Sequence, residues 1–418
     1  MAVDDAERQI SDLRTLLEVS RQLGAVTELM PLLKHIEQAA LTILDCERVT
    51  VFLYDPNDDE LYSKVATGAA DIRFSAKLGI AGEAARTRER VVVNDAYADP
   101  RFNREVDRKT GFHTRNLLTV PMTGHDGRIV GVLQILNKKS GDFTPADEER
   151  AITLALLAGV AVHRQILIDE YTEKQRLQRD LYIAREIQQA SLPRRDPKVD
   201  GFDIAGWNCP ADETGGDCFD FMRLSGDRLA MMVADATGHG IGPALIVSEC
   251  RAFVRAMASV TDDLGLIMSR VNKLISEDLP GGRFVTTFFG VLDAVAGQIH
   301  YCSAGHGPML LVRGATGDAW EFEANMVPLG VLDDVEPKPA SAVTLGPGDI
   351  FVITTDGFFE WPDPAGERFG VQRVVDVIRQ QKNGRMVDLI AAIRQAVTAF
   401  AAGVRQPDDL TIVAVKRL

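Results

Sequence analysis

The stretch that most constrains the fold of this chain is residues 229–246, where an apolar run ends in an aspartate and a glycine-rich turn. A short, bounded apolar run is typical of a buried strand. Asp235 follows the run, and the glycines at 238, 240 and 242 precede an apolar-periodic segment that is typical of a helix. This order presents one carboxylate at the edge of a core. Because aspartate is also an ordinary turn residue, one such position is weak evidence for a site.

Three further places in the chain repeat this arrangement of an aspartate at the end or the start of a predicted strand. The aspartates concerned are Asp217, Asp356, Asp408 and Asp409. If the strands pack in one sheet system, we expect the carboxylates to converge. Two carboxylates about 4 Å apart repel by about 4 kcal/mol at an effective dielectric constant of 20, so such a cluster needs cations. Oxygen ligands select hard ions, Mg²⁺ or Mn²⁺, over zinc. The sequence therefore predicts a two-metal carboxylate site.

Eight motifs occur in order across residues 181–418. They are AREIQQASLP (184–193), GGDCFDF (215–221), DATGHG (235–240), FVTTFFGVLD (284–293), YCSAGHGP (301–308), PLG (328–330), LGPGDIFVITTDGFFE (345–360) and DDLT (408–411). This set resembles the metal-dependent protein phosphatases of the PPM family, in the bacterial SpoIIE/RsbU-type branch. The resemblance implies an α+β fold with two stacked antiparallel sheets flanked by helices. It also implies hydrolysis of phosphoserine or phosphothreonine by a water that two Mn²⁺ or Mg²⁺ ions activate.

The resemblance assigns roles to individual residues. The implied catalytic and metal-ligating positions are Asp217, Asp235, Ala236 (through its carbonyl), Asp356 and Asp408. Asp235 matches the carboxylate that ligates both metals, and Asp217 matches an acidic position that reaches them directly or through water. Asp409 stands where many relatives have asparagine, so we expect it to support the ligands rather than to bind a metal.

Some nearby residues have less certain roles. Thr237 stands where eukaryotic relatives carry a histidine that can protonate the leaving group. Bacterial SpoIIE-type members share the arrangement of this chain, in which that histidine is absent and His239 lies two residues further on. His239 is either such an acid or a residue that stabilises the glycine turn, and the structural role is favoured. His306 is interpreted as a structural loop residue. Arg283 and Arg194 are candidate phosphate contacts.

Two rival interpretations of the catalytic half remain. The segment GHGIG (238–242) could be a phosphate-cradling loop of a nucleotide-binding domain, but it lacks the lysine of a P-loop and the spacing of a dinucleotide fingerprint. Alternatively, the chain is a scaffold that keeps the phosphatase fold without turnover and acts by binding partners. A metal-dependent assay on a phosphoserine peptide separates the scaffold from the enzyme.

Many of the predicted strands in this half are joined by short turns and the helices come in blocks, which favours the α+β class over βαβ units. The predicted helices cover residues 244–258, 264–278, 371–380 and 386–401. The predicted strands cover residues 284–292, 298–303, 309–312, 350–355 and 410–415, besides the run before Asp235.

Composition limits the classes of function. A chain of 418 residues holds two or three domains. Its net charge of −14 argues against a nucleic-acid binder. The five cysteines are scattered without a C-x-x-C pair, which fits a reducing cytoplasm and gives no zinc site. Cys218 is interpreted as a small buried residue rather than a redox sensor. The start lacks a signal-peptide pattern, and the apolar run 151–162 is shorter than the ~20 residues that span a bilayer. We expect a cytoplasmic protein without a membrane segment.

The N-terminal half is predicted to be a second domain. Residues 6–24 have the spacing of an amphipathic helix, and a second helix follows Pro31. From Arg48 the period shortens to that of a hairpin, then a short helix and three further strands, with a loop at 96–115. This order resembles a GAF domain, a small-molecule sensor module, over residues 28–165.

One motif bears on the ligand of this sensor. Asn137-Lys138, Phe143 and Asp147-Glu148 have the spacing found in cyclic-nucleotide-binding GAF domains, where a Lys–Asp salt bridge supports the pocket. The same residues also make an ordinary helix start, with Thr144 as N-cap. A cyclic nucleotide, another small ligand, and a structural or partner-binding role all remain open.

Residues 148–192 contain no helix breaker except Gly159, and Pro193 ends the pattern. The helix is predicted to be a weak coiled coil between sensor and phosphatase. The division is then 1–27 amphipathic helix, 28–165 GAF domain, 166–195 linker and 196–418 phosphatase.

This linker carries two seams. The first contains Leu167, Leu177, Leu181 and Ala184. The second passes through Ile183 and Ile187. A lone helix cannot bury both, so we expect a parallel homodimer in which one seam faces the partner chain and the other docks on the phosphatase. Polar Lys174 and Gln188 in the first seam would keep its pairing weak.

The resemblance to SpoIIE/RsbU-type phosphatases also implies a substrate, which is a phosphorylated anti-sigma-factor antagonist.

Overall fold

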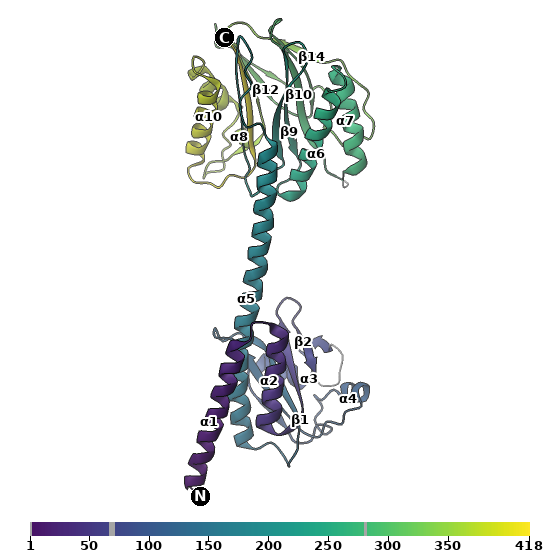
Figure 1. Cartoon of the computed structure of the whole chain (residues 1–418), viewed down its shortest axis with the longest axis vertical. Coiled ribbons are helices and arrows are strands. Elements are labelled where there is room, and N and C mark those ends of the chain that lie inside the picture. The colour runs from purple at the N-terminus through teal and green to yellow at the C-terminus, as the bar shows by residue number, and fades with distance from the viewer. Residues whose placement is uncertain (1, 67–71, 280–281) are drawn as a thin grey trace. The chain divides into compact units, whose positions relative to one another are not determined.

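The computed structural model of the chain describes residues 2–66, 72–279 and 282–418 (Figure 1). These residues divide into two compact units, Met1–Arg176 and Leu177–Leu418. The boundary falls inside one continuous 47-residue helix, α5 (Pro145–Ser191). That helix begins and ends as predicted, since Thr144 and Asp147 bond to each other at its start and Pro193 follows its end.

The first unit is built on one antiparallel sheet with strand order β3-β2-β1-β6-β5-β4. Its strands are β1 (Cys46–Asp55), β2 (Glu60–Ala66), β3 (Ile72–Ser75), β4 (Val91–Val93), β5 (Leu117–Thr123) and β6 (Ile129–Lys138). Its helices before α5 are α1 (Ala2–Ala25), α2 (Leu29–Leu44), α3 (Gly79–Thr87) and α4 (Arg104–Thr110). The segment 96–115 is therefore not an irregular loop throughout. The Asn103 side chain caps the start of α4, and Gly111, with φ of 70°, ends it.

The first part of α5 packs on this sheet through small and apolar residues. Ala151, Leu154 and Ala158 are fully buried there. Gly159 allows the contact, because a Cβ at that position would lie 2.3 Å from the Thr123 carbonyl oxygen. Contrary to the expectation from the short apolar run, α5 is long and apolar enough to cross a membrane by length and composition, with 44% of that window buried. The core helix of a soluble protein passes the same test, and Ala151, Leu154 and Ala158 in this part of α5 are buried against the sheet.

The second unit holds two five-stranded antiparallel sheets, which confirms the predicted α+β class. The first sheet has the order β14-β11-β10-β9-β8 and the second β13-β12-β15-β16-β7. The first contains β8 (Asp217–Arg223), β9 (Arg228–Ala236), β10 (Val285–Asp293), β11 (Gln298–Ala304) and β14 (Ser341–Thr344). The second contains β7 (Phe202–Cys209), β12 (Met309–Val312), β13 (Ala319–Phe322), β15 (Ile350–Thr354) and β16 (Leu410–Arg417).

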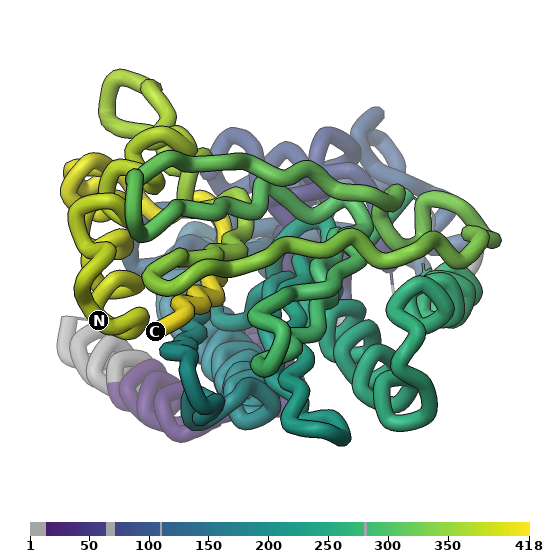
Figure 2. The backbone as a smooth tube through the Cα atoms, turned by 90° about the horizontal axis from the view of Figure 1, so that it is seen from above, coloured from purple at the N-terminus to yellow at the C-terminus, as the bar shows by residue number. Residues whose placement is uncertain are grey.

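Helices cover the outer face of each sheet (Figures 1 and 2). The first sheet is covered by α6 (Ile241–Ala258) and α7 (Leu264–Asp278). The second is covered by α8 (Gly357–Glu360), α9 (Val371–Gln380) and α10 (Met386–Ala401). The core between the sheets contains Phe288 and Phe351, which are fully buried and whose ring centroids lie 6.1 Å apart. Every residue of β9 from Leu229 to Ala234 is also buried. A strand covered on both faces has no polar alternation, which explains the continuous apolar run in the sequence.

Candidate metal and phosphatase site

The first pair of candidate ligands meets across two neighbouring strands. Asp217 begins β8 and lies directly opposite Asp235, near the end of β9. On its other side, Asp235 lies opposite Thr286 of β10. Like charges directly opposite each other in a sheet are destabilising. The register alone therefore places two carboxylates where they need a proton or a cation.

The second sheet delivers its acids at the same end of the sandwich. β15 ends at Thr354 and is followed by Thr355 and Asp356, while β16 starts directly after Asp408 and Asp409. The Thr355 amide donates to the Thr411 carbonyl at 3.0 Å, which aligns the two strands. The Thr355 hydroxyl donates to Asp217 Oδ2 at 2.7 Å and so links this sheet to the other one.

Three glycines make this approach of backbones possible. A Cβ at Gly215 would lie 2.2 Å from Asp409 Oδ2, and a Cβ at Gly357 would lie 2.0 Å from the Asp409 carbonyl oxygen. A Cβ at Gly216 would lie 2.6 Å from the Ala236 carbonyl oxygen. Real side chains do not come this close, so glycine is required at each position. The Gly-Gly-Asp and Asp-Gly motifs of the sequence are therefore explained by the close packing of neighbouring segments against these glycines.

The Asp409 side chain fixes the loop before β8 through backbone hydrogen bonds. It is buried, and its Oδ1 accepts from the Ala211 amide at 2.7 Å while Oδ2 accepts from the Asp217 amide at 3.3 Å. A carboxylate that is engaged on both sides by backbone amides positions the loop. By contrast, Asp408 is exposed. This difference favours a supporting role for Asp409 and a ligand role for Asp408.

The electrostatics show that the acids act on one another. Burial, followed by the charges of Asp356, Asp408 and Asp409, raises the pKa of Asp235 to about 7. Burial and the Asp235 charge raise the pKa of Asp217 well above its usual range. Burial and the Asp408 charge also raise the pKa of Asp356. Such a cluster is short of positive charge.

The donor set fits a hard divalent cation in kind, because it consists of carboxylate and carbonyl oxygens. The residues that would hold such ions are Asp217, Asp235, Ala236, Asp356 and Asp408. Across the ranges that the structure describes, however, no group of three or more His, Cys, Asp or Glu side chains is arranged so that it could hold a metal ion. One oxygen of Asp217 is engaged by Thr355. The acids are therefore neighbours without forming a finished coordination shell.

The two histidines near the site differ in their surroundings. His239 is exposed, and its Nδ1 lies 2.7 Å from Asp212 Oδ2, so it ties the glycine turn to the loop before β8. His306 is buried, with Nδ1 3.1 Å from the Thr286 hydroxyl. Burial lowers the pKa of His306 to about 4, so its ring is neutral at physiological pH. These contacts favour structural roles for both.

Cys218 follows Asp217 in the sequence but cannot serve as a nucleophile. Its side chain is buried, and burial raises the pKa of its thiol well above the usual value. Only the thiolate is nucleophilic. The interpretation of Cys218 as a small core residue agrees with this environment.

Gln188 is a residue whose role the sequence analysis misjudged. The side-chain amide is buried and forms two hydrogen bonds with Gly215, donating to its carbonyl at 2.6 Å and accepting from its amide at 3.2 Å. The prediction that Gln188 weakens a helix pairing in the first seam is therefore wrong. Ile183 and Ile187 of the second seam are instead exposed, at 45% and 68%. Gln188 lies in the first of the eight phosphatase motifs, and this position was the feature of the sequence that could have indicated a contact with the catalytic unit.

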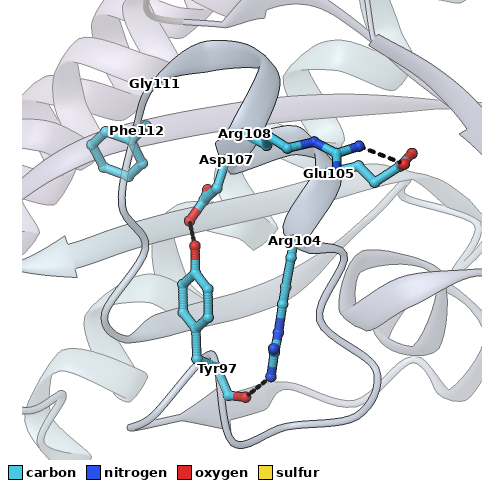
Figure 3. Close-up of a pocket in the computed structure, with 7 residues that line it drawn as sticks. All are labelled: Tyr97, Arg104, Glu105, Asp107, Arg108, Gly111 and Phe112. Carbon is cyan, nitrogen blue, oxygen red and sulfur yellow. Dashed lines mark hydrogen bonds and ion pairs between the residues drawn. The ribbon is translucent and has the colours of Figure 1, made fainter.

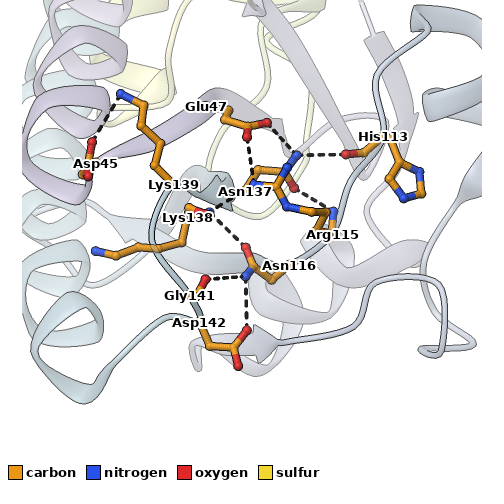
Figure 4. Close-up of polar contacts among 10 residues, drawn as sticks. All are labelled: Asp45, Glu47, His113, Arg115, Asn116, Asn137, Lys138, Lys139, Gly141 and Asp142. Carbon is orange, nitrogen blue, oxygen red and sulfur yellow. Dashed lines mark hydrogen bonds and ion pairs between the residues drawn. The ribbon is translucent and has the colours of Figure 1, made fainter.

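In the sensor unit, Asn137 organises a network of polar contacts (Figure 4). Its Nδ2 donates to Glu47 Oε2 at 2.9 Å and to the His113 carbonyl at 2.8 Å, and its Oδ1 accepts from the Arg115 amide at 2.7 Å. Asn137 has a positive φ of 57°, a conformation that asparagine tolerates better than most residues. The network fixes the end of β6 beside the loop before β5.

The next residue makes the salt bridge that the GAF motif implies. Lys138 Nζ lies 2.7 Å from Asp147 Oδ1, and both side chains are nearly buried. Burial acts to raise the pKa of Asp147, but hydrogen bonds from Lys138 and Thr144 outweigh it and lower the pKa. The prediction of a Lys–Asp pair is confirmed, and the helix-start interpretation is also correct, since Thr144 bonds to the same carboxylate.

A pocket of about 440 Å³ lies beside α4 in this unit (Figure 3). It is lined by Tyr97, Arg104, Glu105, Asp107, Arg108, Gly111 and Phe112. The Tyr97 hydroxyl donates to Asp107 Oδ2 at 3.2 Å, and Arg108 pairs with Glu105 at 3.0 Å. Arg104 contacts the Tyr97 carbonyl. The pocket thus offers two aromatic rings and two guanidinium groups.

Comparisons with known proteins agree with this geometry. Residues 225–418 match the family described as stage II sporulation protein E (SpoIIE), and residues 28–162 match the GAF domain. The structure is similar to the SiaA-PP2C domain of Pseudomonas aeruginosa, with a TM-score of 0.52 and 22% identity, covering 58% of this chain and 98% of that one. This similarity shows the fold.

Two curated relatives are similar over part of their length. A probable 3′,5′-cyclic phosphodiesterase, pde-5 of Caenorhabditis elegans, is 31% identical over 39% of this chain and 24% of its own. Protein IcfG of Synechocystis is 24% identical over 57% of this chain and 41% of its own. The chain thus spans well under half the length of either relative. The chain thus carries a GAF domain over residues 28–162 and a SpoIIE-family domain with a PP2C-like fold over residues 225–418.

Proposed function

We propose that this protein is a metal-dependent protein serine/threonine phosphatase whose activity is controlled by its GAF domain. The observation that carries the proposal is the convergence of four acids from two sheets at one end of the sandwich. Asp217 faces Asp235 across the strands, and Asp356 and Asp408 raise the pKa of Asp235. Membership of a family that is generally dependent on divalent metals supports the same conclusion.

The chain's own residues prepare this site for phosphoester hydrolysis. Bound Mn²⁺ or Mg²⁺ would supply Lewis acidity, which acidifies water and offsets charge on phosphoryl oxygens. Asp235 stands at the centre of the acids, Thr355 orients Asp217, and Asp409 holds the loop that carries Asp217. Water attacks phosphorus, the bond to the serine or threonine oxygen breaks, and that oxygen takes up a proton. Cys218 is buried, so its thiol is not available to attack the phosphoester.

We further propose that the substrate is a phosphorylated protein of the anti-sigma-factor-antagonist class and that the protein works in the cytoplasm. A homodimer formed through α5 is part of the proposal. Its support is the exposed apolar side chains of α5, which one chain leaves uncovered: Leu156, Leu167, Ile168, Tyr171, Leu177, Ile183 and Ile187. Light scattering on the whole chain and on an Ile187→Asp variant tests it, because a monomeric wild-type protein contradicts the dimer.

For the sensor we propose a small ligand, with a cyclic nucleotide as the first candidate. The support is the Lys138–Asp147 pair together with a pocket that offers aromatic rings for a base and arginines for a phosphate. Cyclic AMP or cyclic GMP at 100 times its dissociation constant would stabilise the domain by about 2.7 kcal/mol. The measurement is the melting temperature of the whole chain with either nucleotide, and no shift at millimolar concentration excludes both.

The enzyme is tested by hydrolysis of p-nitrophenyl phosphate and of a phosphoserine peptide with and without Mn²⁺ or Mg²⁺. We expect turnover only with metal, and almost none from Asp356→Asn protein that melts like the wild type. Full turnover in EDTA would contradict the mechanism. A folded wild-type protein without turnover on any phosphoprotein would favour the partner-binding scaffold.

A further inference from the structure

Arg283 is held beside the strand that carries Asp235. Its neighbour Phe284 is bonded to Thr237 from both sides, because the Phe284 amide donates to the Thr237 hydroxyl at 3.0 Å and the Phe284 carbonyl accepts from the Thr237 amide at 3.1 Å. Thr237 is two residues beyond Asp235, and Thr286, three residues beyond Arg283, lies directly opposite Asp235. The main chain at Arg283 is therefore fixed at the mouth of the acidic cluster.

The guanidinium of Arg283 lies against Gly242, in the first turn of α6. A Cβ built on Gly242 would lie 2.8 Å from Arg283 Nη1. Gly242 has no positive φ that would require glycine for its own backbone. Glycine at this position thus leaves the space in which the arginine head lies.

The guanidinium of Arg283 has no charged partner among the residues that the structure describes. The side chain is exposed, and it forms no ion pair or hydrogen bond with any residue in the described ranges. Other basic groups near the site differ, since Arg405 and His239 both pair with Asp212 and Arg368 pairs with Glu360. A guanidinium carries five N–H donors, and all of them at Arg283 are available to a ligand.

A phosphate monoester is the ligand class that this position suits. Its dianion is repelled by the acids that carry the site, so an adjacent uncommitted cation assists its approach. The planar guanidinium also matches two phosphate oxygens at once, which a lysine ammonium cannot do. If Arg283 served only to hold the turn, we would expect an acceptor for its N–H groups, whereas the turn is held by Thr237 and Phe284.

We infer that Arg283 contacts the phosphoryl group of the phosphoserine or phosphothreonine substrate and thereby sets substrate affinity. The inference rests on the proposed phosphatase function and deepens it by naming a substrate-binding residue outside the acidic cluster. Gly242 has a secondary role, since it leaves the space in which the guanidinium lies.

The test measures KM and kcat for a phosphoserine peptide with Mn²⁺, and the inhibition constant of inorganic phosphate, on the whole chain. We expect Arg283→Gln to raise KM and the phosphate inhibition constant together, by about tenfold, since it loses charge-assisted hydrogen bonds. kcat should change less than KM. Arg283→Lys should recover part of the affinity, and Gly242→Ala, which displaces the guanidinium, should raise KM by a smaller factor.

Arg270→Gln is the matched control, because Arg270 is exposed on α7 and its replacement removes the same charge. It should leave KM and the phosphate inhibition constant unchanged. Melting temperatures confirm that each variant is folded. If the wild type is active and Arg283→Gln changes neither constant, or changes kcat alone, the inference is overturned while the phosphatase function stands. If the wild type hydrolyses no phosphopeptide with metal, the proposed function itself fails.

Discussion

The two units of this molecule treat buried charge in opposite ways. In the sensor unit, the buried Asp147 has a lysine and a threonine as partners, and its pKa is lowered despite burial. In the catalytic unit, Asp217, Asp235 and Asp356 face one another, and burial raises the pKa of each. The sensor unit satisfies its acids within the chain, whereas the catalytic unit leaves its acids unsatisfied. A site that is to bind cations must keep ligands that the fold itself does not neutralise.

The largest expected effect comes from removing the central charge of the catalytic unit. Asp235→Asn should abolish nearly all activity, because it removes the proposed shared ligand. In EDTA the same variant should melt higher than the wild type, because repulsion among the remaining acids falls. Activity assays check the first expectation and thermal melts in EDTA check the second. Asp376→Asn, at an exposed position, is the control for both. A lower melting temperature in EDTA would contradict the comparison between the units.

The opposite result is expected in the sensor unit. Lys138→Met removes the nearer cation of the buried Asp147 and leaves Arg150 at 3.7 Å, and breaking a buried pair costs up to about 3–5 kcal/mol. We expect the first unit to melt well below the wild type, with an intact second unit. Replacing both partners, Lys138→Met with Asp147→Leu, should restore part of the stability. Differential scanning calorimetry separates the two transitions, and an unchanged first transition would show that the pair is not stabilising.

The buried His306 should make the stability of the second unit depend on pH. Its pKa is lowered to about 4 by burial, while an unfolded histidine titrates near 6.5. Below about 6.5 the unfolded state binds the proton and the folded state does not, so stability of the second unit falls as pH decreases toward 4. The loss should reach about 2 kcal/mol at pH 5. Urea melts of wild type and His306→Asn at pH 7.5 and 5 measure it, and an equal loss in both proteins would exclude His306 as the source.

The smallest expected effect concerns Gln188. Gln188→Ala removes both hydrogen bonds to Gly215, at a cost of about 1–2 kcal/mol. Because Gly215 precedes the Asp217 loop, we expect a several-fold higher Mn²⁺ concentration for half-maximal activity. Gln189→Ala is the control, since Gln189 makes one long contact with Asn208 at 3.4 Å. An equal metal requirement in both variants would show that α5 does not act on the site through Gln188.

Local patterns in the sequence predicted much of this fold. The helices at 264–278, 371–380 and 386–401 have the predicted bounds, because each presents a clear apolar stripe. Short edge strands such as β13 and β14 were not predicted, since half-exposed four-residue segments carry little periodicity. The four-residue α8 after Asp356 was missed for the same reason.

The residues of the candidate site were likewise predicted only in part from local patterns. The aspartates were selected as candidates because each stands beside a glycine or at the end or the start of an apolar run. Thr355 and Gln188 were not identified as contacts of the site, because the residues that they touch lie far away in the sequence. Hydrogen bonds between distant segments follow from tertiary packing and leave no local pattern.

The two glycines that enclose Asp409 have a consequence for which side chains the site tolerates. With Gly215 on its carboxylate side and Gly357 against its main chain, we expect the space at position 409 to admit a side chain with one methylene and no more. Selection at this position should therefore act on length before charge. A glutamate, which keeps the charge, should be excluded as firmly as a leucine, whereas an asparagine, which gives up the charge, still fits and keeps one oxygen for a backbone amide.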